Sequence, residues 1–281
     1  MRISESCADC LFRRQSARNP DPDYLAEVRR LIDNRSENDT APLLVWRFNN
    51  AWEKRFGASD RYADVKRRSN DFMLELEDSL RTRIAASTDP LAAALAFARI
   101  GNYIDYGALD TVELPACMRL FDGAALREDE REVYRRFTDC CAEAERFLLI
   151  ADNCGEIVLD KLFLEQLKLL YPKLSLQVLV RGREVLNDVT PQDAVYTGID
   201  RLAEILSNGE ALAGTVCDML PEEARRAFDS ADVILAKGQG NYESLSGQGR
   251  HIFYAFLCKC ELFTRRFDVP LLTAMLVEEG T

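Results

Sequence analysis

The sequence predicts an α/β fold in which an all-helical region precedes a mostly parallel sheet with helices on both faces. Between residue 1 and about residue 143, apolar residues recur at helical spacing, and no strand pattern competes with it. From Arg146 onward, short apolar runs alternate with helical stretches, which is typical of parallel strands joined by crossover helices. We therefore expect a helical region over 1–143 and an α/β domain over 144–281.

Two helices of the first part are marked by their starts. Asp21-Pro22 and Asp89-Pro90 each place an N-cap residue before a proline at the first helical position. The alanine-rich helix that follows Asp89 is expected to stop at Gly101. The spacing of apolar residues predicts three further helices, over 41–56, 62–83 and 129–145.

The second part is expected to contain at least four strands and three helices. Apolar runs predict strands over 147–151, 176–180, 233–236 and 252–257. Helical patterns predict helices up to about residue 170 after the first strand, over 199–206 and over 221–228. This alternation favours a parallel sheet covered on both faces.

Three of these strands end in polar residues. Asp152-Asn153 follow the first strand, Asn187-Asp188 lie shortly past the second, and Lys237-Gly238 end the third, with Asn241 close behind. Because the carboxyl ends of parallel strands meet at one edge of the sheet, we expect these clusters to converge. The alternative is that Asp152 and Asn153 merely cap the helix that follows them.

The chemistry of this cluster suits a metal ion beside a phosphate. Two carboxylates and an amide oxygen are hard ligands, appropriate to Mg²⁺ or Mn²⁺, and they would also accept Co²⁺ or Ni²⁺. Lys237, expected in a glycine-rich loop, offers a positive charge and neighbouring backbone N–H groups to a phosphoryl oxygen. Together with a helix N-terminus, these groups form a constellation suited to phosphoryl transfer.

A second candidate region is the segment G-N-Y-I-D-Y-G over 101–107. It places Asn102 and Asp105 between two glycines directly after a buried helix. A structural turn would explain the glycines but not both polar groups. We therefore expect this segment to have a functional role.

The overall charge and the apolar runs limit the partners. Lys and Arg number 36 against 47 Asp and Glu, which gives a net charge of −11. An acidic surface argues against nucleic acid or an anionic membrane as a partner. No apolar run reaches membrane-spanning length, and the first residues lack the apolar segment of a signal peptide. A soluble, cytoplasmic protein is expected.

Several other kinds of site are disfavoured by the sequence. The single histidine, His251, precedes an apolar strand and reads as structural, and the nucleotide-binding pattern G-x-x-x-x-G-K-[ST] is absent. Cys154 has no adjacent base, which disfavours a thiol nucleophile. The nine cysteines are expected to be reduced. Cys7-x-x-Cys10 and Cys258-x-Cys260 either form a four-thiolate metal site or are simply thiols.

The motifs taken together resemble a known family. The segments on which the resemblance depends are D-N-C-G-E over 152–156, N-D-V-T-x-x-D-A over 187–194 and K-G-Q-G-N-Y-E over 237–243. This ordered set resembles the metal-dependent damage-control phosphatases, formerly domain-of-unknown-function family 89. The 101–107 segment and the opening C-x-x-C are similar to the prokaryotic, cysteine-containing branch of that family. The resemblance implies a helical region followed by a Rossmann-like α/β/α sandwich.

The resemblance also implies roles for individual residues. The metal would be held by Asp152, Asn153 and Asp188, and Lys237 would contact the phosphate. The family usually has alanine at the position of Cys154, a change that should not disturb the ligands. The residues implied to surround the substrate are Asn102, Asp105, Gly155, Glu156, Gly238, Asn241 and Glu243.

The implied function is a divalent-metal-dependent phosphatase that hydrolyses phosphate esters of small sugar or damaged metabolites. Either a water or Asp152 would attack phosphorus, and Asp105 or Glu156 would serve as the acid near an attacking water. The alternative is a regulatory protein that binds metal and phosphometabolite without turnover. A methyltransferase is set aside because the first strand lacks a G-x-G-type turn. The oligomeric state and the substrate are left open.

Overall fold

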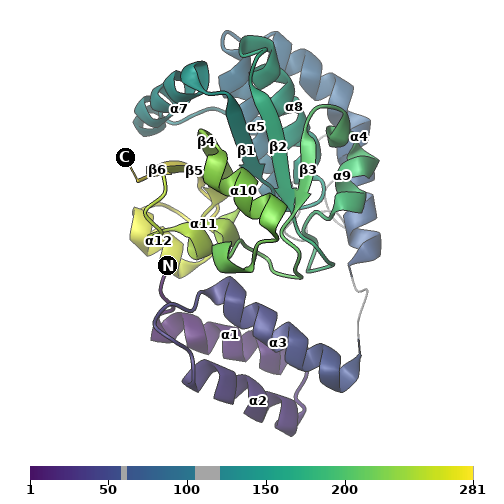
Figure 1. Ribbon diagram of the computed structural model, residues 1–281, viewed down its shortest axis with the longest axis vertical. Coiled ribbons are helices and arrows are strands. Elements are labelled where there is room, and N and C mark those ends of the chain that lie inside the picture. Colours follow the sequence, from purple (N-terminus) through teal and green to yellow (C-terminus); the bar gives the residue numbers. More distant parts are fainter. Residues whose placement is uncertain (58–61, 105–120, 281) are drawn as a thin grey trace.

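The computed structural model describes residues 1–57, 62–104 and 121–280, without the side chains of 102–104. Its centre is a six-stranded sheet with the order β3-β2-β1-β4-β5-β6 (Figure 1). The strands are β1 Arg146–Ile150, β2 Ser175–Val180, β3 Glu204–Ser207, β4 Val233–Lys237, β5 Ile252–Leu257 and β6 Ala274–Glu279. All neighbouring strands are parallel except β5 and β6. The prediction of an α/β fold with a mostly parallel sheet is confirmed.

Helices occupy most of the rest of the described chain. They are α1 Glu5–Arg18, α2 Pro22–Asp33, α3 Ala41–Phe56, α4 Ala63–Ala85, α5 Pro90–Ile104, α7 Arg131–Glu143, α8 Glu156–Leu170, α9 Pro191–Thr197, α10 Glu222–Ser230, α11 Gln239–Leu245 and α12 Glu261–Phe267. The two predicted proline starts are correct. Asp21 accepts a hydrogen bond from the Tyr24 N–H at 2.8 Å, and Asp89 accepts one from the Ala92 N–H at 3.0 Å.

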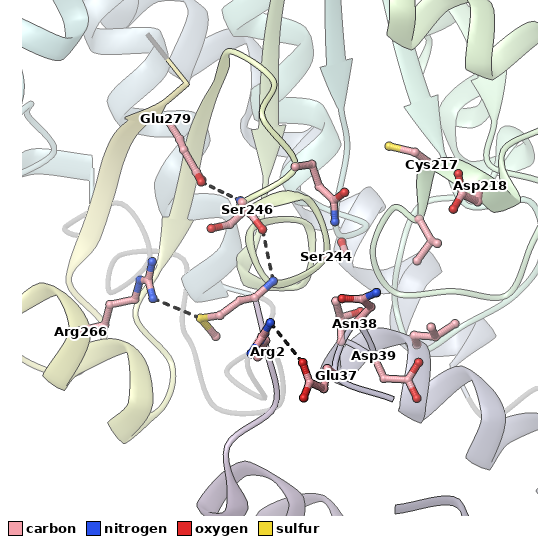
Figure 2. Close-up of a pocket in the computed structure, with 16 residues that line it drawn as sticks. Arg2, Glu37, Asn38, Asp39, Cys217, Asp218, Ser244, Ser246, Arg266 and Glu279 are labelled. Atoms are coloured by element: carbon pink, nitrogen blue, oxygen red, sulfur yellow. Dashed lines mark hydrogen bonds and ion pairs between the residues drawn. The ribbon is translucent and has the colours of Figure 1, made fainter. Parts of the chain in front are cut away.

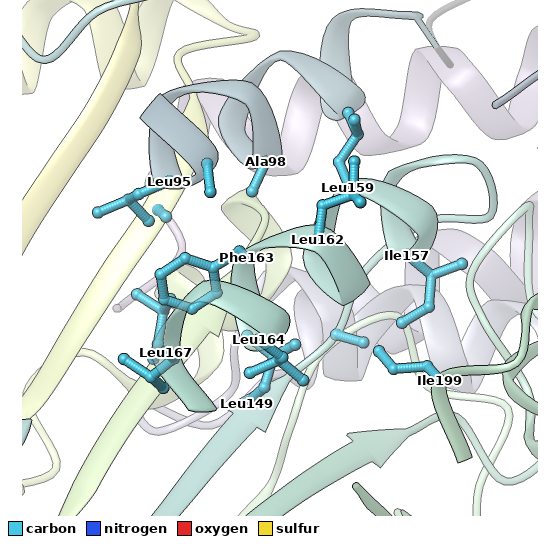
Figure 3. Packing of buried hydrophobic residues seen from close by; sticks show 14 of the residues in the cluster. Leu95, Ala98, Leu149, Ile157, Leu159, Leu162, Phe163, Leu164, Leu167 and Ile199 are labelled. Atoms are coloured by element: carbon cyan, nitrogen blue, oxygen red, sulfur yellow. The ribbon is translucent and has the colours of Figure 1, made fainter. Parts of the chain in front are cut away.

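The alternation of side chains along the strands separates two cores. Phe147 and Leu149 of β1 point to the face covered by α4, α5, α7 and α8, whereas Leu148 and Ile150 point to the face covered by α10, α11 and α12. Figure 3 shows α8 between α5 and β1, with Phe163 and Leu167 in the first of these cores. Since both faces of the sheet are covered, the strands read as continuous apolar runs.

Helices α1, α2 and α3 form a third core of their own at one end of the molecule (Figure 1). Val28, Leu44 and Phe48 are fully buried in it. In contrast, α4, α5 and α7 contribute to the core beneath the sheet. The division between residues 143 and 144 remains a prediction, because helices on both sides of it share one core.

Three details of the prediction are wrong. Helix α5 continues through Gly101 to Ile104, because this glycine serves close helix packing and does not end the helix. Residues 199–206 form one 3₁₀ turn, Ile199–Arg201, and then β3, because left-handed Gly198 ends α9 and the short edge strand pairs with β2. The glycine-rich stretch after Lys237 becomes helical from Gln239 onward as α11.

Other elements were not predicted. Helices α9 and α12 have seven residues each, which is too short for a clear helical period, and β6 lies at the edge of the sheet. Within the described residues, no helix is both long enough and apolar enough to cross a membrane.

Candidate metal and phosphate site

The predicted polar clusters meet at the carboxyl ends of β1 and β2. An isolated antiparallel bridge joins Asn153 to Asp188. The backbone N–H of Cys154 donates to the Asn187 carbonyl at 2.9 Å, and the N–H of Val189 donates to the Asp152 carbonyl at 2.9 Å. These backbone bonds fix the segment after β2 against the turn after β1. Asp152, Asn153 and Asp188 are therefore brought together, as the sequence predicts.

Arg181, the residue after β2, contacts both carboxylates. Its Nε donates to Asp188 Oδ2 at 2.6 Å, and its Nη2 donates to Asp152 Oδ1 at 3.2 Å. Its Nη1 donates to the Gly214 carbonyl at 3.0 Å and to Asn241 Oδ1 at 3.2 Å. The guanidinium is thus held from both sides, and the Arg181 residue is fully buried.

The amide of Asn153 has a defined orientation. Its Nδ2 donates to Asp152 Oδ2 at 2.7 Å and to Glu156 Oε2 at 3.2 Å. Because both donor hydrogens are directed at carboxylates, the amide oxygen is left as the acceptor that faces elsewhere. That oxygen is the group a hard cation would use.

Two glycines let the backbone approach these side chains. Gly238 has φ +79°, and a Cβ there would lie 2.0 Å from Asp152 Oδ2. Gly155, also at φ +79°, forms the turn before α8, and its N–H donates to Asn70 Oδ1 at 2.7 Å. Both positions favour glycine because L-residues rarely adopt this backbone region, and at 238 a side chain would also collide with Asp152. Asn70 of α4 therefore fastens the turn that carries Asp152 and Asn153.

The residues present fit a divalent cation of the hard type. Asp152 and Asp188 supply carboxylates, and Asn153 supplies an amide oxygen. Burial raises the pKa of the Asp188 carboxyl to about 7, although Arg181 opposes the shift. Among residues 1–57, 62–104 and 121–280, no three or more His, Cys, Asp or Glu side chains form a metal cluster. A metal here would accordingly depend on the amide as well as on the two acids.

The Lys237 ammonium is directed inward, onto two buried acids and a backbone carbonyl. The residue is fully buried, and its Nζ donates to Glu156 Oε1 at 2.6 Å, to Asp160 Oδ1 at 2.6 Å and to the Ala98 carbonyl at 3.1 Å. Burial alone would lower the pKa of Lys237, but Asp160 and Glu156 raise it on balance. All three ammonium donors are therefore used inside the protein.

Glu156 occupies the position between Lys237 and the predicted ligands. Its two carboxylate oxygens accept separately, Oε1 from Lys237 and Oε2 from Asn153. The residue is 1% exposed. Its contacts therefore orient Asn153, and its burial does not favour the role of an acid near an attacking water.

Helix α5 brings the start of the 101–107 segment against the start of α8. A Cβ on Gly101 would lie 2.8 Å from Glu156 Cα and 2.9 Å from its Cβ, so α5 rests directly on the start of α8. Asn102, the next residue of α5, is carried to this edge of the sheet by its backbone. Its side chain, and the whole of Asp105, lie outside the described residues.

Asn241 and Glu243 take different positions. Asn241 is fully buried, accepts from Arg181 and from Thr215 Oγ1, and donates to the carbonyls of Ala151 and Lys237. Asn241 therefore helps to hold Arg181 against the ends of β1 and β4. Glu243 accepts from Gln239 Nε2 at 3.2 Å, and burial raises its pKa to about 7. None of its contacts between described residues joins it to Asp152, Asn153 or Asp188.

Sequence reasoning did not include three residues that the structure places here. Arg181 was recognised only as the end of a strand, although an arginine followed by glycine at a strand end is a usable signal. Asn70 lies on another helix, and no local pattern reveals its contact with Gly155. Lys259 follows β5, and its charge acts on Asp188 to lower the pKa of that carboxyl. Its backbone N–H donates to Gln239 Oε1 at 3.1 Å.

The other candidate chemistries receive no support from the described residues. His251 contacts Glu278 Oε1 at 2.9 Å near the amino end of β5, away from the carboxyl edge of the sheet. Cys154 is fully buried, and burial raises the pKa of its thiol well above the ordinary value. Cys258 is buried, whereas Cys260 is partly exposed, and the described residues contain no four-thiolate cluster.

A cavity of about 760 Å³ lies elsewhere, on the α11 and α12 side of the sheet. Figure 2 shows Arg266 and Glu279 on one side of it and Cys217 and Asp218 on the other, above the segment Glu37–Asp39. Residues 1 and 2 reach into it from the amino terminus. No predicted site residue lines this cavity, so its size does not make it the catalytic site.

Comparison with known proteins gives a consistent result. A damage-control phosphatase of Archaeoglobus fulgidus is 30% identical over 297 residues and covers 99% of this chain and 100% of its own. A damage-control phosphatase of Pyrococcus horikoshii is 29% identical over 223 residues, covering 77% of this chain and 74% of its own. The crystal structure of a family 89 protein from Pyrococcus horikoshii superposes with a TM-score of 0.84 at 23% identity, with all of both chains covered, which shows the same fold.

The sequence signature of the family spans nearly the whole chain. The "damage-control phosphatase ARMT1-like domain" matches residues 3–274. The relatives named as phosphatases support a phosphatase role for this chain as well. The chain belongs to the damage-control phosphatase family.

Proposed function

We propose that this protein is a divalent-metal-dependent phosphomonoesterase that acts on small phosphorylated metabolites, sugar phosphates or damaged metabolites among them. The odd number of scattered cysteines, which we expect to be reduced, supports the cytoplasm as its compartment. Mg²⁺, Mn²⁺, Co²⁺ and Ni²⁺ are the candidate ions.

One observation carries the proposal. Asp152, Asn153 and Asp188 present two carboxylates and an oriented amide at the carboxyl edge of a parallel sheet, where α/β proteins bind ligands. A divalent ion held by these oxygens would polarise a phosphoryl oxygen and lower the pKa of a coordinated water. A role in helix capping alone would not require Arg181 and Glu156 to fix the side chains as they do.

The burial of Lys237 changes its proposed role. Lys237 donates to Glu156, and Glu156 in turn accepts from the Asn153 amide, so the role we propose for Lys237 is to position these two residues. Lys259 is a second cation near these acids, since its charge acts on Asp188 from the end of β5. Substituting Lys259 by methionine tests whether it helps to bind the substrate: such a role predicts a larger effect on KM for phosphate esters than on Tm, and an unchanged KM would exclude it.

Water is the nucleophile that the side-chain contacts favour. Both carboxylate oxygens of Asp152 accept hydrogen bonds, from Arg181 and from Asn153, which lowers the nucleophilicity of that carboxylate. Asp105 stays the candidate for the acid near the attacking water, since Glu156 is buried and paired. Gly155 and Gly238 contribute by shaping the backbone around Asp152 and Asn153.

The decisive experiment measures phosphate release by metal-stripped protein to which each of the four ions is returned. p-Nitrophenyl phosphate and a panel of sugar phosphates serve as substrates. We expect activity to require metal and to fall at least about 100-fold in Asp152→Asn and in Asp188→Asn, because each loses a ligand. Asp218→Asn is the matched control, since the Asp218 side chain is 98% exposed and lies in the 3₁₀ turn Cys217–Met219, apart from the proposed ligands.

Two results would contradict the proposal. Full activity in both ligand variants would show that Asp152 and Asp188 do not hold a catalytic metal. Tight metal binding without turnover of any phosphate ester would favour a regulatory protein that binds metal and phosphometabolite.

A further inference from the structure

Arg181 is a permanent positive charge placed between the two acids of the proposed metal site. Its guanidinium donates to Asp188 at 2.6 Å and to Asp152 at 3.2 Å, and its side chain is 1% exposed. Asp188 is also buried, with 4% of its side chain exposed. An arginine in this position neutralises carboxylates through charge-assisted hydrogen bonds.

The guanidinium does not depend on the carboxylates alone for its position. Nη1 donates to the Gly214 carbonyl and to Asn241 Oδ1, and Asn241 is itself fixed by the carbonyls of Ala151 and Lys237. Arg181 also directly follows β2, and its backbone N–H donates to the Val189 carbonyl at 2.9 Å. Arg181 therefore stays in place when another cation approaches the two acids.

Buried carboxylates that share a site repel each other and lose hydration, and a counter-ion must offset both costs. We propose that Arg181 is the resident counter-ion of this site, a positioning residue that holds Asp152 and Asp188 together before a metal binds. The proposal rests on the metal-dependent function above. It explains how the acids stay close and ordered in a metal-free chain.

This arrangement also sets the charge of the loaded site. Two carboxylates, one guanidinium and one divalent ion sum to a single positive charge, to which Lys259 adds its own. A phosphate monoester is a dianion at neutral pH, so the loaded site attracts it. Without Arg181 the charge of the loaded site would be lower by one.

The test compares thermal stability with and without metal. Arg181→Gln removes the charge and should lower Tm by about 6–10 °C in EDTA, because buried Asp188 and largely buried Asp152, with 13% of its side chain exposed, lose the cation that contacts both of them. With saturating Mn²⁺ the loss should be less than half as large, because the ion then supplies the missing charge. Arg99→Gln is the matched control: Arg99 is a buried arginine that pairs with buried Glu130 at 2.7 Å in another part of the fold. The loss of Tm in Arg99→Gln should be the same in EDTA and in Mn²⁺.

A double-mutant cycle in EDTA tests the counter-ion role without any metal. Arg181→Gln should lower the free energy of unfolding in an Asp188→Asn background by at most half of what it does in the wild type, since the negative charge of Asp188 is already removed. If the Arg181→Gln variant does not fold, Arg181→Lys replaces it. Because lysine keeps the charge, this variant should retain most of the stability in EDTA, and a loss of Tm as large as that of Arg99→Gln would overturn the counter-ion role.

The possible outcomes separate the two proposals. Equal losses of Tm in EDTA and in Mn²⁺, while Mn²⁺ stabilises the wild type, would overturn the counter-ion role and leave the metal site standing. A positive coupling in EDTA with no effect of Mn²⁺ on the wild type would support the counter-ion role and refute the metal site. An absence of coupling in the cycle would overturn the counter-ion role whatever the metal does.

Discussion

Among glycine-to-alanine substitutions at the proposed metal site, Gly238→Ala should cause the largest loss of metal affinity and stability. The Cβ of an alanine at 238 would lie 2.0 Å from Asp152 Oδ2 and 2.2 Å from its Cγ. These distances are far inside van der Waals contact, so the Asp152 carboxylate must move. Its hydrogen bonds with Arg181 Nη2 and Asn153 Nδ2 would then be lost or stretched.

The magnitude has two parts. Gly238 has φ +79° and ψ 154°, a region that is almost exclusive to glycine, and an alanine there costs about 1–3 kcal/mol. Displacing a carboxylate from charge-assisted hydrogen bonds adds about 2–3 kcal/mol. For a chain of this length, the sum corresponds to a fall in Tm of about 6–12 °C. Metal affinity should fall at least about 100-fold, because a ligand has moved.

Gly247→Ala is the matched control for this prediction. Gly247 has φ +82°, but a Cβ there would meet nothing within 4 Å. Its substitution should therefore show the backbone strain alone, a loss of about 1–3 kcal/mol, and leave metal affinity and activity unchanged. Thermal unfolding, calorimetric titration with Mn²⁺ and phosphate release would be measured on both variants. Wild-type metal affinity in Gly238→Ala would refute the reasoning, as would equal losses in both variants.

Four further outcomes are expected. Lys237→Met should lower the free energy of unfolding, measured in urea, by about 3–5 kcal/mol, because buried Glu156 and Asp160 lose their cationic partner. A large rise in KM with unchanged stability would instead support Lys237 as a phosphate contact. Burial raises the pKa of Asp160 to about 7. The folded protein without metal therefore binds the Asp160 proton more tightly than the unfolded chain does, and the free energy of unfolding should decline as pH rises from about 4 to 7. The Asp160→Asn variant should show a slope that is shallower by up to about 1.4 kcal/mol per pH unit, and an unchanged slope would contradict this assignment. Cys154→Ala should keep phosphate release within about threefold of the wild type, since the thiol is buried and takes no part in the chemistry, whereas loss of turnover would point to a nucleophilic thiol. Gly101→Ala should lower Tm although alanine favours helices by about 1 kcal/mol, because its Cβ would strike Glu156, and a rise in Tm would show that α5 can withdraw at no cost.

Much of the fold could be predicted because its signals are local. Asp21 and Asp89 each stand before a proline, and each caps a helix as the pattern indicates. The strand runs before Asp152 and Lys237 are apolar at every position because both faces of the sheet are covered. The edge strand β3 has no such signal: it has four residues, and only Leu206 among them is buried.

The site was predictable in part for the same reason. Asp152 and Asp188 follow strands that pair in register, so their meeting follows from the order of the sheet. The direction of the Lys237 side chain does not follow from sequence, because it depends on Glu156 and Asp160 of α8 on the neighbouring face. A glycine-rich surrounding suggested an open phosphate loop, but the backbone becomes helical at once and the ammonium turns inward.

The order of the strands explains why these residues meet where they do. From β1 the chain proceeds to β2 and β3 on one side, and it later returns as β4 and proceeds to β5 and β6 on the other side. Helix α8 leaves β1 toward one face and α11 leaves β4 toward the opposite face, so the order of the sheet reverses between β1 and β4, the place where α/β proteins bind ligands. Asp152 follows β1 and Gly238 follows β4, and the two residues lie directly against each other. A side chain at 238 would take the space of the Asp152 carboxylate, and glycine leaves that space free.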